Sequence, residues 1–152
     1  MSKIFSSALL LCVLLSISHA SGASNVGGFL SQSGCTSSTF NFVDNVEVGP
    51  APDFKITVTP ILSGLCPDSS GEKENSTLNL GTCIGNNNAH LIWQKNGMFQ
   101  NTCGCNLTMP SLCCSCGKAN GGTVSSGVCI DLDQGVAASG GQLNCNVLPS
   151  NS

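Results

Sequence analysis

The residues best suited to do chemistry in this chain are neutral amides, which gather in the run Asn86-Asn87-Asn88. An amide donates and accepts hydrogen bonds without titrating. Charged residues make up only 9% of the chain, the net charge is −3, and no basic patch is present. This composition indicates a surface that works through neutral hydrogen bonds, and it argues against a nucleic-acid partner. The asparagines are also good turn formers, so the run alone does not establish a binding site.

Groups that could support catalysis are scarce. His90 is the only histidine outside the expected leader, so a Ser-His-Asp or Cys-His arrangement is not credible. Asp131 and Asp133 would share one face of a strand, as a carboxylate pair could. We expect them to bond the backbone at a strand end, because glycoside hydrolysis would also need one raised pKa in a cleft. We therefore predict that the protein is not an enzyme and uses no cofactor.

The first twenty residues predict a secretory signal peptide. Lys3 gives it a positive start, Ala8–Ile17 is an apolar core, and Ser18-His19-Ala20 offers small residues at the cleavage point. We expect a leader over residues 1–20, a tail over 21–27, one domain over 28–146 and a C-terminal tail over 147–152. No later segment is long and apolar enough to span a bilayer. We therefore expect a secreted, extracellular protein without membrane insertion.

The cysteines predict disulfides. Eleven are present, and ten remain once Cys12 is removed with the leader. An even number of cysteines in the oxidising secretory pathway favours disulfides. The close spacing of the cysteines from Cys103 to Cys116 would favour zinc only in a reducing compartment. We therefore expect no metal.

The register of one hairpin predicts two of the bridges. Cys103 and Cys116 flank the same expected turn as the two cysteines inside them, Cys105 and Cys114. An antiparallel hairpin then places each pair directly opposite on one face. An internal repeat of the chain matches Cys35 and Cys66 to Cys103 and Cys116, which gives a third pair. The last two pairs join the four cysteines that remain, and sequence alone does not fix their connectivity. The expected pairs are Cys103–Cys116, Cys105–Cys114, Cys35–Cys66, Cys83–Cys145 and Cys113–Cys129.

Two stretches of the chain share one apolar pattern at a constant offset of 52. Leu78, Leu80, Ile84, Leu91 and Trp93 correspond to Ile130, Leu132, Val136, Leu143 and Cys145. Apolar pairs spaced by two predict strands on either side of a polar turn, which is Gly85–Asn88 in the first stretch and Ala138–Gly141 in the second. A repeat of this kind means two copies of one supersecondary unit. We expect Trp93 to be a core residue.

The segments outside this repeated pattern also predict strands. Phe29–Cys35 predicts a short strand before the first cysteine of the domain, with Met98–Cys103 as its counterpart. The segment between Cys35 and Cys66 is longer than its counterpart, with a loop at Val48–Pro52 before a strand resumes. Many short strands without helical periodicity predict an all-β domain.

The chain resembles the cyanovirin-N homology (CVNH) family over about Gly28–Asn146, through the stretches STLNLGTCIGNNNAHLIWQ, FQNTC and CIDLDQGVAASGGQLNC. The resemblance implies two tandem pseudo-symmetric repeats, about 28–94 and 98–146. Each would hold a three-stranded antiparallel sheet plus a β-hairpin, stapled by disulfides, and the repeats would exchange segments. Family members are small lectins for oligomannose glycans, so we expect a secreted high-mannose lectin. It would be a monomer, or a homodimer that exchanges segments about Gln94–Gly97.

The resemblance also implies two sugar sites, of which one is better kept. Its residues are Gly85, Asn86, Asn88, Gly97, Asn101, Thr102, Lys118 and Asn120. A glutamate common in that turn is Gly85 here, and an arginine common after the fourth family cysteine falls close to Ala119. These departures would weaken binding or change its linkage preference. We expect Asn86 and Asn101 to be replaceable by alanine with little loss of melting temperature.

The other site is expected to be weak or lost, because small residues replace the usual Asn and Asp of its turn. We also expect the insertion between Cys35 and Cys66 to cover or reshape this end. The residues that map to the site are Gln32, Ser33, Pro67, Ser69, Ala138, Ser139 and Gly140.

The alternative interpretation is a disulfide-rich extracellular protein that keeps the scaffold for structure or interaction and binds no glycan. Gly85 and the altered second end favour this alternative, whereas the asparagines and Thr102 favour a lectin. Sequons at Asn75 and Asn106 predict glycosylation, at Asn106 only if its side chain faces outward.

Overall fold

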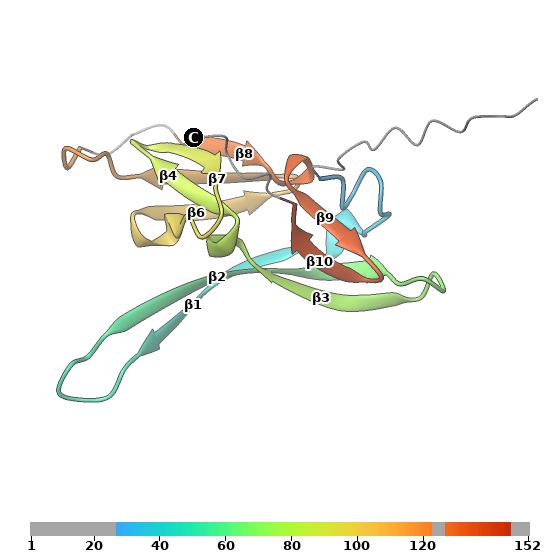
Figure 1. Cartoon of the computed structure of the whole chain (residues 1–152), viewed down its shortest axis with the longest axis horizontal. Coiled ribbons are helices and arrows are strands. Elements are labelled where there is room, and N and C mark those ends of the chain that lie inside the picture. The colour runs from blue at the N-terminus through green and yellow to red at the C-terminus, as the bar shows by residue number, and fades with distance from the viewer. Residues whose placement is uncertain (1–26, 123–126, 147–152) are drawn as a thin grey trace, which may run out of the picture.

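The computed structural model describes residues 27–122 and 127–146 (Figure 1). The expected signal peptide (1–20), residues 21–26 of the expected N-terminal tail and the expected C-terminal tail (147–152) lie outside the described residues. The elements of the described part are β-strands and short 3-10 helices, and each pair of neighbouring strands is antiparallel. The all-β class predicted from the sequence is confirmed. None of the described helices is long and apolar enough to cross a membrane.

Each repeat forms one three-stranded sheet and one hairpin, as predicted (Figure 1). The strand order is β1-β2-β3 in the first sheet and β6-β7-β8 in the second. The first repeat contains β1 (Asn41–Val48), β2 (Ile56–Pro67), β3 (Lys73–Asn79), β4 (Ile84–Asn87) and β5 (His90–Trp93). The second contains β6 (Cys103–Thr108), β7 (Ser111–Cys116), β8 (Val128–Asp131), β9 (Val136–Ser139) and β10 (Gln142–Cys145).

A 3-10 helix separates sheet from hairpin in both repeats, η2 (Leu80–Thr82) in the first and η4 (Leu132–Gln134) in the second. The side chain of Asn79 accepts a hydrogen bond from Gly81 N at 2.9 Å, and that of Asp131 accepts one from Asp133 N at 3.0 Å. These bonds cap the first turn of each 3-10 helix and end the preceding strand. The offset of 52 therefore holds from the end of the third strand through the hairpin.

The turn predicted over Gly85–Asn88 is placed wrongly, because Gly85, Asn86 and Asn87 belong to β4. The turn consists of Asn88 and Ala89, whose φ angles are +50° and +68°. A two-residue turn between twisted antiparallel strands needs positive φ at both positions, and asparagine tolerates it well. The second hairpin differs from the prediction in the same way, since its turn is Gly140-Gly141 rather than the whole of Ala138–Gly141.

The strand predicted over Phe29–Cys35 is also wrong, because this segment is a run of turns. Local turn bonds run from Gln32 N to Gly28 O at 2.8 Å and from Cys35 N to Phe29 O at 3.0 Å, while Phe29 N bonds to Val136 O of the second repeat at 3.2 Å. The counterpart segment holds the 3-10 helix η3 (Phe99–Asn101), and a further one, η1 (Ser37–Thr39), precedes β1.

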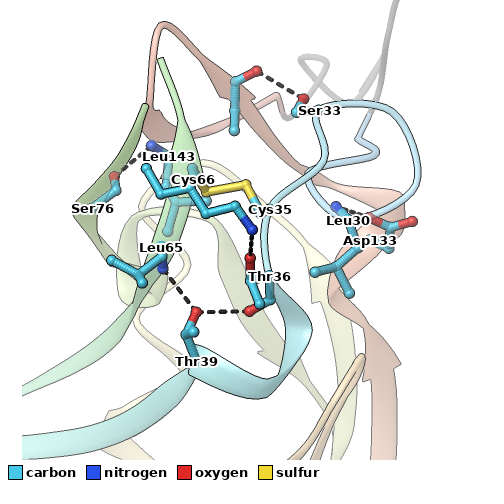
Figure 2. Close-up of a disulfide and its surroundings, with 12 residues drawn as sticks. Leu30, Ser33, Cys35, Thr36, Thr39, Leu65, Cys66, Ser76, Asp133 and Leu143 are labelled. Carbon is cyan, nitrogen blue, oxygen red and sulfur yellow. Dashed lines mark hydrogen bonds between the residues drawn. A yellow bond between two sulfur atoms is a disulfide. The ribbon is translucent and has the colours of Figure 1, made fainter. Parts of the chain in front are cut away.

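The two repeats exchange their hairpins. The hairpin strand β5 of the first repeat lies against β8 of the second sheet, and β10 of the second repeat lies against β3 of the first sheet. The buried hydroxyl of Ser76 in β3 accepts a hydrogen bond from Leu143 N in β10 at 2.7 Å (Figure 2). Each hairpin thus buries its apolar side on the other repeat's sheet, which makes the two repeats one domain.

The core draws matching residues from both repeats and is closed by disulfides. The matched buried residues are Phe29 and Phe99, Leu62 and Leu112, Leu80 and Leu132, and Ile84 and Val136. Trp93 packs against this core as predicted, with its ring over Gly135. The disulfides are Cys35–Cys66, Cys83–Cys145, Cys103–Cys116, Cys105–Cys114 and Cys113–Cys129. These are the five pairs expected from the sequence.

The insertion between Cys35 and Cys66 folds into the paired strands β1 and β2, which we call the arm (residues 41–63). The arm projects from the body at the end that carries the β4–β5 hairpin, away from β9 and β10 (Figure 1). The expectation that the insertion covers the end with Ser33 and Ser139 is therefore wrong. Pairing continues from Asn41 opposite Ser63 to Val48 opposite Ile56, so the extra residues lengthen a hairpin instead of folding back over the body.

Candidate functional site

Asn86 in β4 joins three segments of the chain. Its Nδ2 donates to Thr102 Oγ1 at 2.8 Å and to the carbonyl oxygen of Gly117 at 2.9 Å. Its Oδ1 accepts from the backbone amide of Ala89 at 2.8 Å. The side chain therefore ties the β4–β5 hairpin to the residue before Cys103 and the residue after Cys116. These are the three segments that the sequence analysis placed in the better-kept site.

The turn after β7 lies against the tip of the β4–β5 hairpin. The backbone amide of Ala119 donates to Asn88 Oδ1 at 3.4 Å. Lys118 N donates to Gly122 O at 2.5 Å, and Asn120 Oδ1 accepts from Gly122 N at 3.2 Å, so the turn is closed by its own bonds. Lys118 and Asn120 therefore stand at the same end of the molecule as Asn88.

Gly85 and Gly97 contribute close backbone contact. A Cβ on Gly97 would lie 2.4 Å from Gly85 Cα, and one on Gly85 would lie 2.2 Å from Gln94 Oε1. Gly85 also forms an isolated β-bridge with Met98. Gly97 is needed because its Cβ would meet the backbone of β4, whereas a Cβ on Gly85 would meet only the side chain of Gln94, which would have to shift. They hold the segment that leads into Asn101, and they offer no side chain to a ligand.

The polar groups left exposed at this end form one surface, which we call the amide surface. Asn86 has already used both of its N–H groups, so it can offer a ligand little more than a lone pair on Oδ1. Its contacts do not fit the expectation that it could be removed without loss of stability. The amide surface consists of Asn88, Asn101, Thr102, Lys118 and Asn120, all of which are exposed.

The opposite end brings together the second set of predicted residues with different chemistry (Figure 2). Ser33 Oγ donates to the carbonyl oxygen of Ala138 at 2.9 Å, and Leu30 N donates to Asp133 Oδ1 at 2.7 Å. Ala138 occupies the position that Asn86 holds in the first hairpin, so no amide side chain ties this end together.

The loop between β2 and β3 completes the second end. A Cβ on Gly141 would lie 3.5 Å from Asp68 Cα, which places the loop beside the β9–β10 turn. The Ser70 hydroxyl, followed by the backbone amides of Ser70, Glu72 and Gly71, holds the pKa of Asp68 below its ordinary value. Of the residues expected at this end, Gln32, Ser69, Ser139 and Gly140 are exposed.

The carboxylates that the sequence singled out are committed to backbone groups. Asp131 caps η4 through its bond with Asp133 N. Asp133 Oδ1 accepts from Leu30 N at 2.7 Å and from Ser31 N at 3.3 Å. Over residues 27–122 and 127–146, no group of three or more His, Cys, Asp or Glu side chains is placed to hold a metal ion.

Two parts of the site were missed in the sequence. Gly117 and Ala119 act through backbone atoms, which leave no mark in a pattern of side chains. Gln100 and the arm residues Lys55–Val58 line a groove beside Asn101. The composition of the insertion indicated a loop and a strand, but it carried no signal for the direction in which the arm projects.

Fold and site together define a pseudo-symmetric, disulfide-stapled β domain with a polar surface at one end that contains one cation and no carboxylate. The family model of the CVNH domain matches residues 51–145, and the chain belongs to this family. No curated protein matches the chain.

Several solved structures share the fold. The microvirin:mannobiose complex is 26% identical to this chain, with 72% of this chain and 95% of that one covered and a TM-score of 0.50. NcCVNH from N. crassa is 18% identical, with coverage of 73% and 93% and a TM-score of 0.51. A MoCVNH3 variant in complex with (N-GlcNAc)4 is 13% identical, with coverage of 72% and 95% and a TM-score of 0.52.

Proposed function

We propose that this protein is a secreted lectin that binds oligomannose glycans at the amide surface and catalyses no reaction. Membership of the CVNH family supports carbohydrate binding. The similarity to microvirin, whose structure is a complex with mannobiose, supports a mannose-containing ligand. The expected leader over residues 1–20 supports secretion.

The observation that carries the proposal is the set of three hydrogen bonds made by Asn86. These bonds fix the hairpin tip, Thr102 and the turn after β7 in one arrangement. The exposed amides and hydroxyl of the amide surface then converge from three segments. Adjacent sugar hydroxyls both donate and accept, and such groups match them without needing a charge.

The proposed binding is weak at a single site and gains strength from multivalency. The amide surface presents a few hydrogen bonds on an exposed face, which limits the affinity of one site. At the second end Ala138 replaces the organising asparagine, so we propose that this end contributes little. Avidity would then come from several glycans on one target, or from a dimer that exchanges segments about Gln94–Gly97. Light scattering of the purified protein measures which oligomer forms.

A glycan array probed with the oxidised, secreted protein tests the proposal. Oligomannose glycans should give the strongest signals. Asn101→Ala should lower the affinity for mannobiose by about tenfold or more, because it removes one amide of the site. Asn144→Ala is the matched control, since Asn144 is an exposed asparagine in β10 at the other end. An array without mannose signals from folded protein would show the proposal to be wrong, and unchanged binding by Asn101→Ala would move the site elsewhere.

A further inference from the structure

The outer half of the arm presents an apolar face that the body does not cover. Opposed residues of an antiparallel pair share a face, so Val46 and Val58 lie on the same side as Val48 and Ile56. Val46, Val48 and Ile56 are 60%, 63% and 65% exposed. Closer to the body, the same face becomes core, with Pro60 and Leu62 buried. The arm therefore carries the apolar inner face of the first sheet outward beyond the domain.

This face forms one wall of a groove of about 450 Å³ between β2 and η3. That volume lies within the range of roughly 300–1,000 Å³ that is typical of small-molecule sites. Asn101 lines the groove and also belongs to the amide surface, so the two are continuous. The residues that line the groove are Lys55, Ile56, Thr57, Val58, Met98, Gln100 and Asn101.

The lining combines an apolar wall with neutral amides and contains no carboxylate. Ile56, Val58 and Met98 supply the apolar part, and Met98 is 53% exposed. Gln100 and Asn101 form the opposite wall, on which the side chain of Asn101 is exposed. In the part of the chain that the structure describes, Gln100 Oε1 is buried and has no hydrogen-bond partner. This amide packs against Gly81, since a Cβ on that glycine would lie 2.7 Å from Gln100 Oε1 and 2.9 Å from Nε2, so the exposed amide of this wall is that of Asn101.

We propose that this groove is a subsite for an N-acetylhexosamine unit of the same glycan whose mannose units occupy the amide surface. The acetamido group carries a methyl for the wall of Ile56 and Met98, and an amide that pairs with the exposed amide of Asn101. An unsubstituted hexose has no methyl to cover that wall. The inference rests on the proposed function, because Asn101 is the residue at which the two parts of the ligand meet.

Calorimetry with paired ligands tests the subsite. One ligand is an oligomannose glycan that ends in two N-acetylglucosamine units, and the other is the same oligomannose without them. The wild-type protein should bind the first about tenfold more tightly. Ile56→Ser should remove that difference and leave the affinity for the second ligand unchanged. Val48→Ser is the matched control, because Val48 is equally exposed on the same face but does not line the groove, and it should behave as wild type.

The outcomes separate this inference from the proposed function. If both ligands bind equally, or if Ile56→Ser keeps the difference, the subsite is wrong while the lectin proposal stands. If neither ligand binds to folded protein, the lectin proposal is wrong. In that case, a titration of ¹⁵N-labelled protein with the disaccharide of N-acetylglucosamine tests the subsite by itself. Backbone amide shifts at Ile56, Thr57 and Gln100 would support the subsite, and their absence would overturn it.

Discussion

Replacing Asn86 with alanine should destabilise the protein as well as abolish binding. The substitution removes two donated bonds, to Thr102 Oγ1 and Gly117 O, and one accepted bond, from Ala89 N. At about 1 kcal/mol net for each hydrogen bond, the free energy of unfolding should fall by about 3 kcal/mol. Ala89 is buried, so its amide loses its partner where water cannot readily replace it.

Guanidinium unfolding of the oxidised protein measures this loss, followed by the fluorescence of Trp93, the chain's one tryptophan. Asn101→Ala removes an exposed amide and should change the unfolding free energy by less than about 0.5 kcal/mol. Asn86→Asp keeps the acceptor for Ala89 N but turns a carboxylate oxygen toward Gly117 O, so it should be at least as destabilised at neutral pH as the alanine variant. A loss below about 0.5 kcal/mol for Asn86→Ala would refute the role assigned to this side chain.

Three further predictions follow from contacts elsewhere in the molecule. Gly97→Ala should lower the free energy of unfolding by about 1–3 kcal/mol, because its Cβ would meet backbone atoms. Gly104→Ala is the control and should be tolerated, because a Cβ there would meet no atom within 4 Å. Equal stability of the two variants would contradict this packing. Because the pKa of Asp68 is lowered, its ionised form stabilises the fold at neutral pH, and this contribution is lost as the pH falls through the folded pKa. In an NMR titration, Ser70→Ala should raise the pKa of Asp68 toward its ordinary value. An unmoved pKa would contradict the assigned cause. Asn106 is exposed on the outer face of β6, so protein secreted from a eukaryotic host should carry a glycan there. Mass spectrometry should show that Asn106→Gln removes the mass of that glycan. An unglycosylated Asn106 in the secreted wild-type protein would contradict the prediction.

The repeated part of the fold could be predicted because its physical causes are local and occur twice. Apolar residues at matching positions, with a constant offset of 52, identify the two copies from the sequence alone. Cys103 and Cys116 flank a short turn, so hairpin register fixed that disulfide and the one inside it. Asp131 bonds the backbone at a strand end as expected, and Asn79 forms the same cap at the same offset in the first repeat.

The parts that were predicted wrongly depend on long-range contacts or on backbone angles. The Asn88-Ala89 turn needs positive φ at an alanine, which composition does not suggest. The pattern of Phe29–Cys35 predicts a strand, but Gln32 N turns back to Gly28 O and Leu30 N bonds to Asp133, 103 residues away. The direction of the arm was not predictable, because it depends on how far β1 and β2 stay paired and on what lies beside them.

For the candidate site, the sequence supplied the segments but not the role of each residue. The resemblance grouped Asn86, Asn101 and Thr102, and the structure bonds Asn86 directly to Thr102. It did not indicate that Asn86 holds the site together while Asn88 and Asn101 remain exposed. That distinction comes from hydrogen-bond partners, which a list of residue types does not contain.

The most direct test of the central claim is a titration of ¹⁵N-labelled protein with mannobiose, followed by amide chemical shifts. The account predicts saturable shifts that gather at Asn88, Asn101, Thr102, Lys118 and Asn120, with none at Ser33 or Ser139 on the opposite end. Saturable shifts confined to that opposite end, or no shifts at millimolar mannobiose, would contradict it.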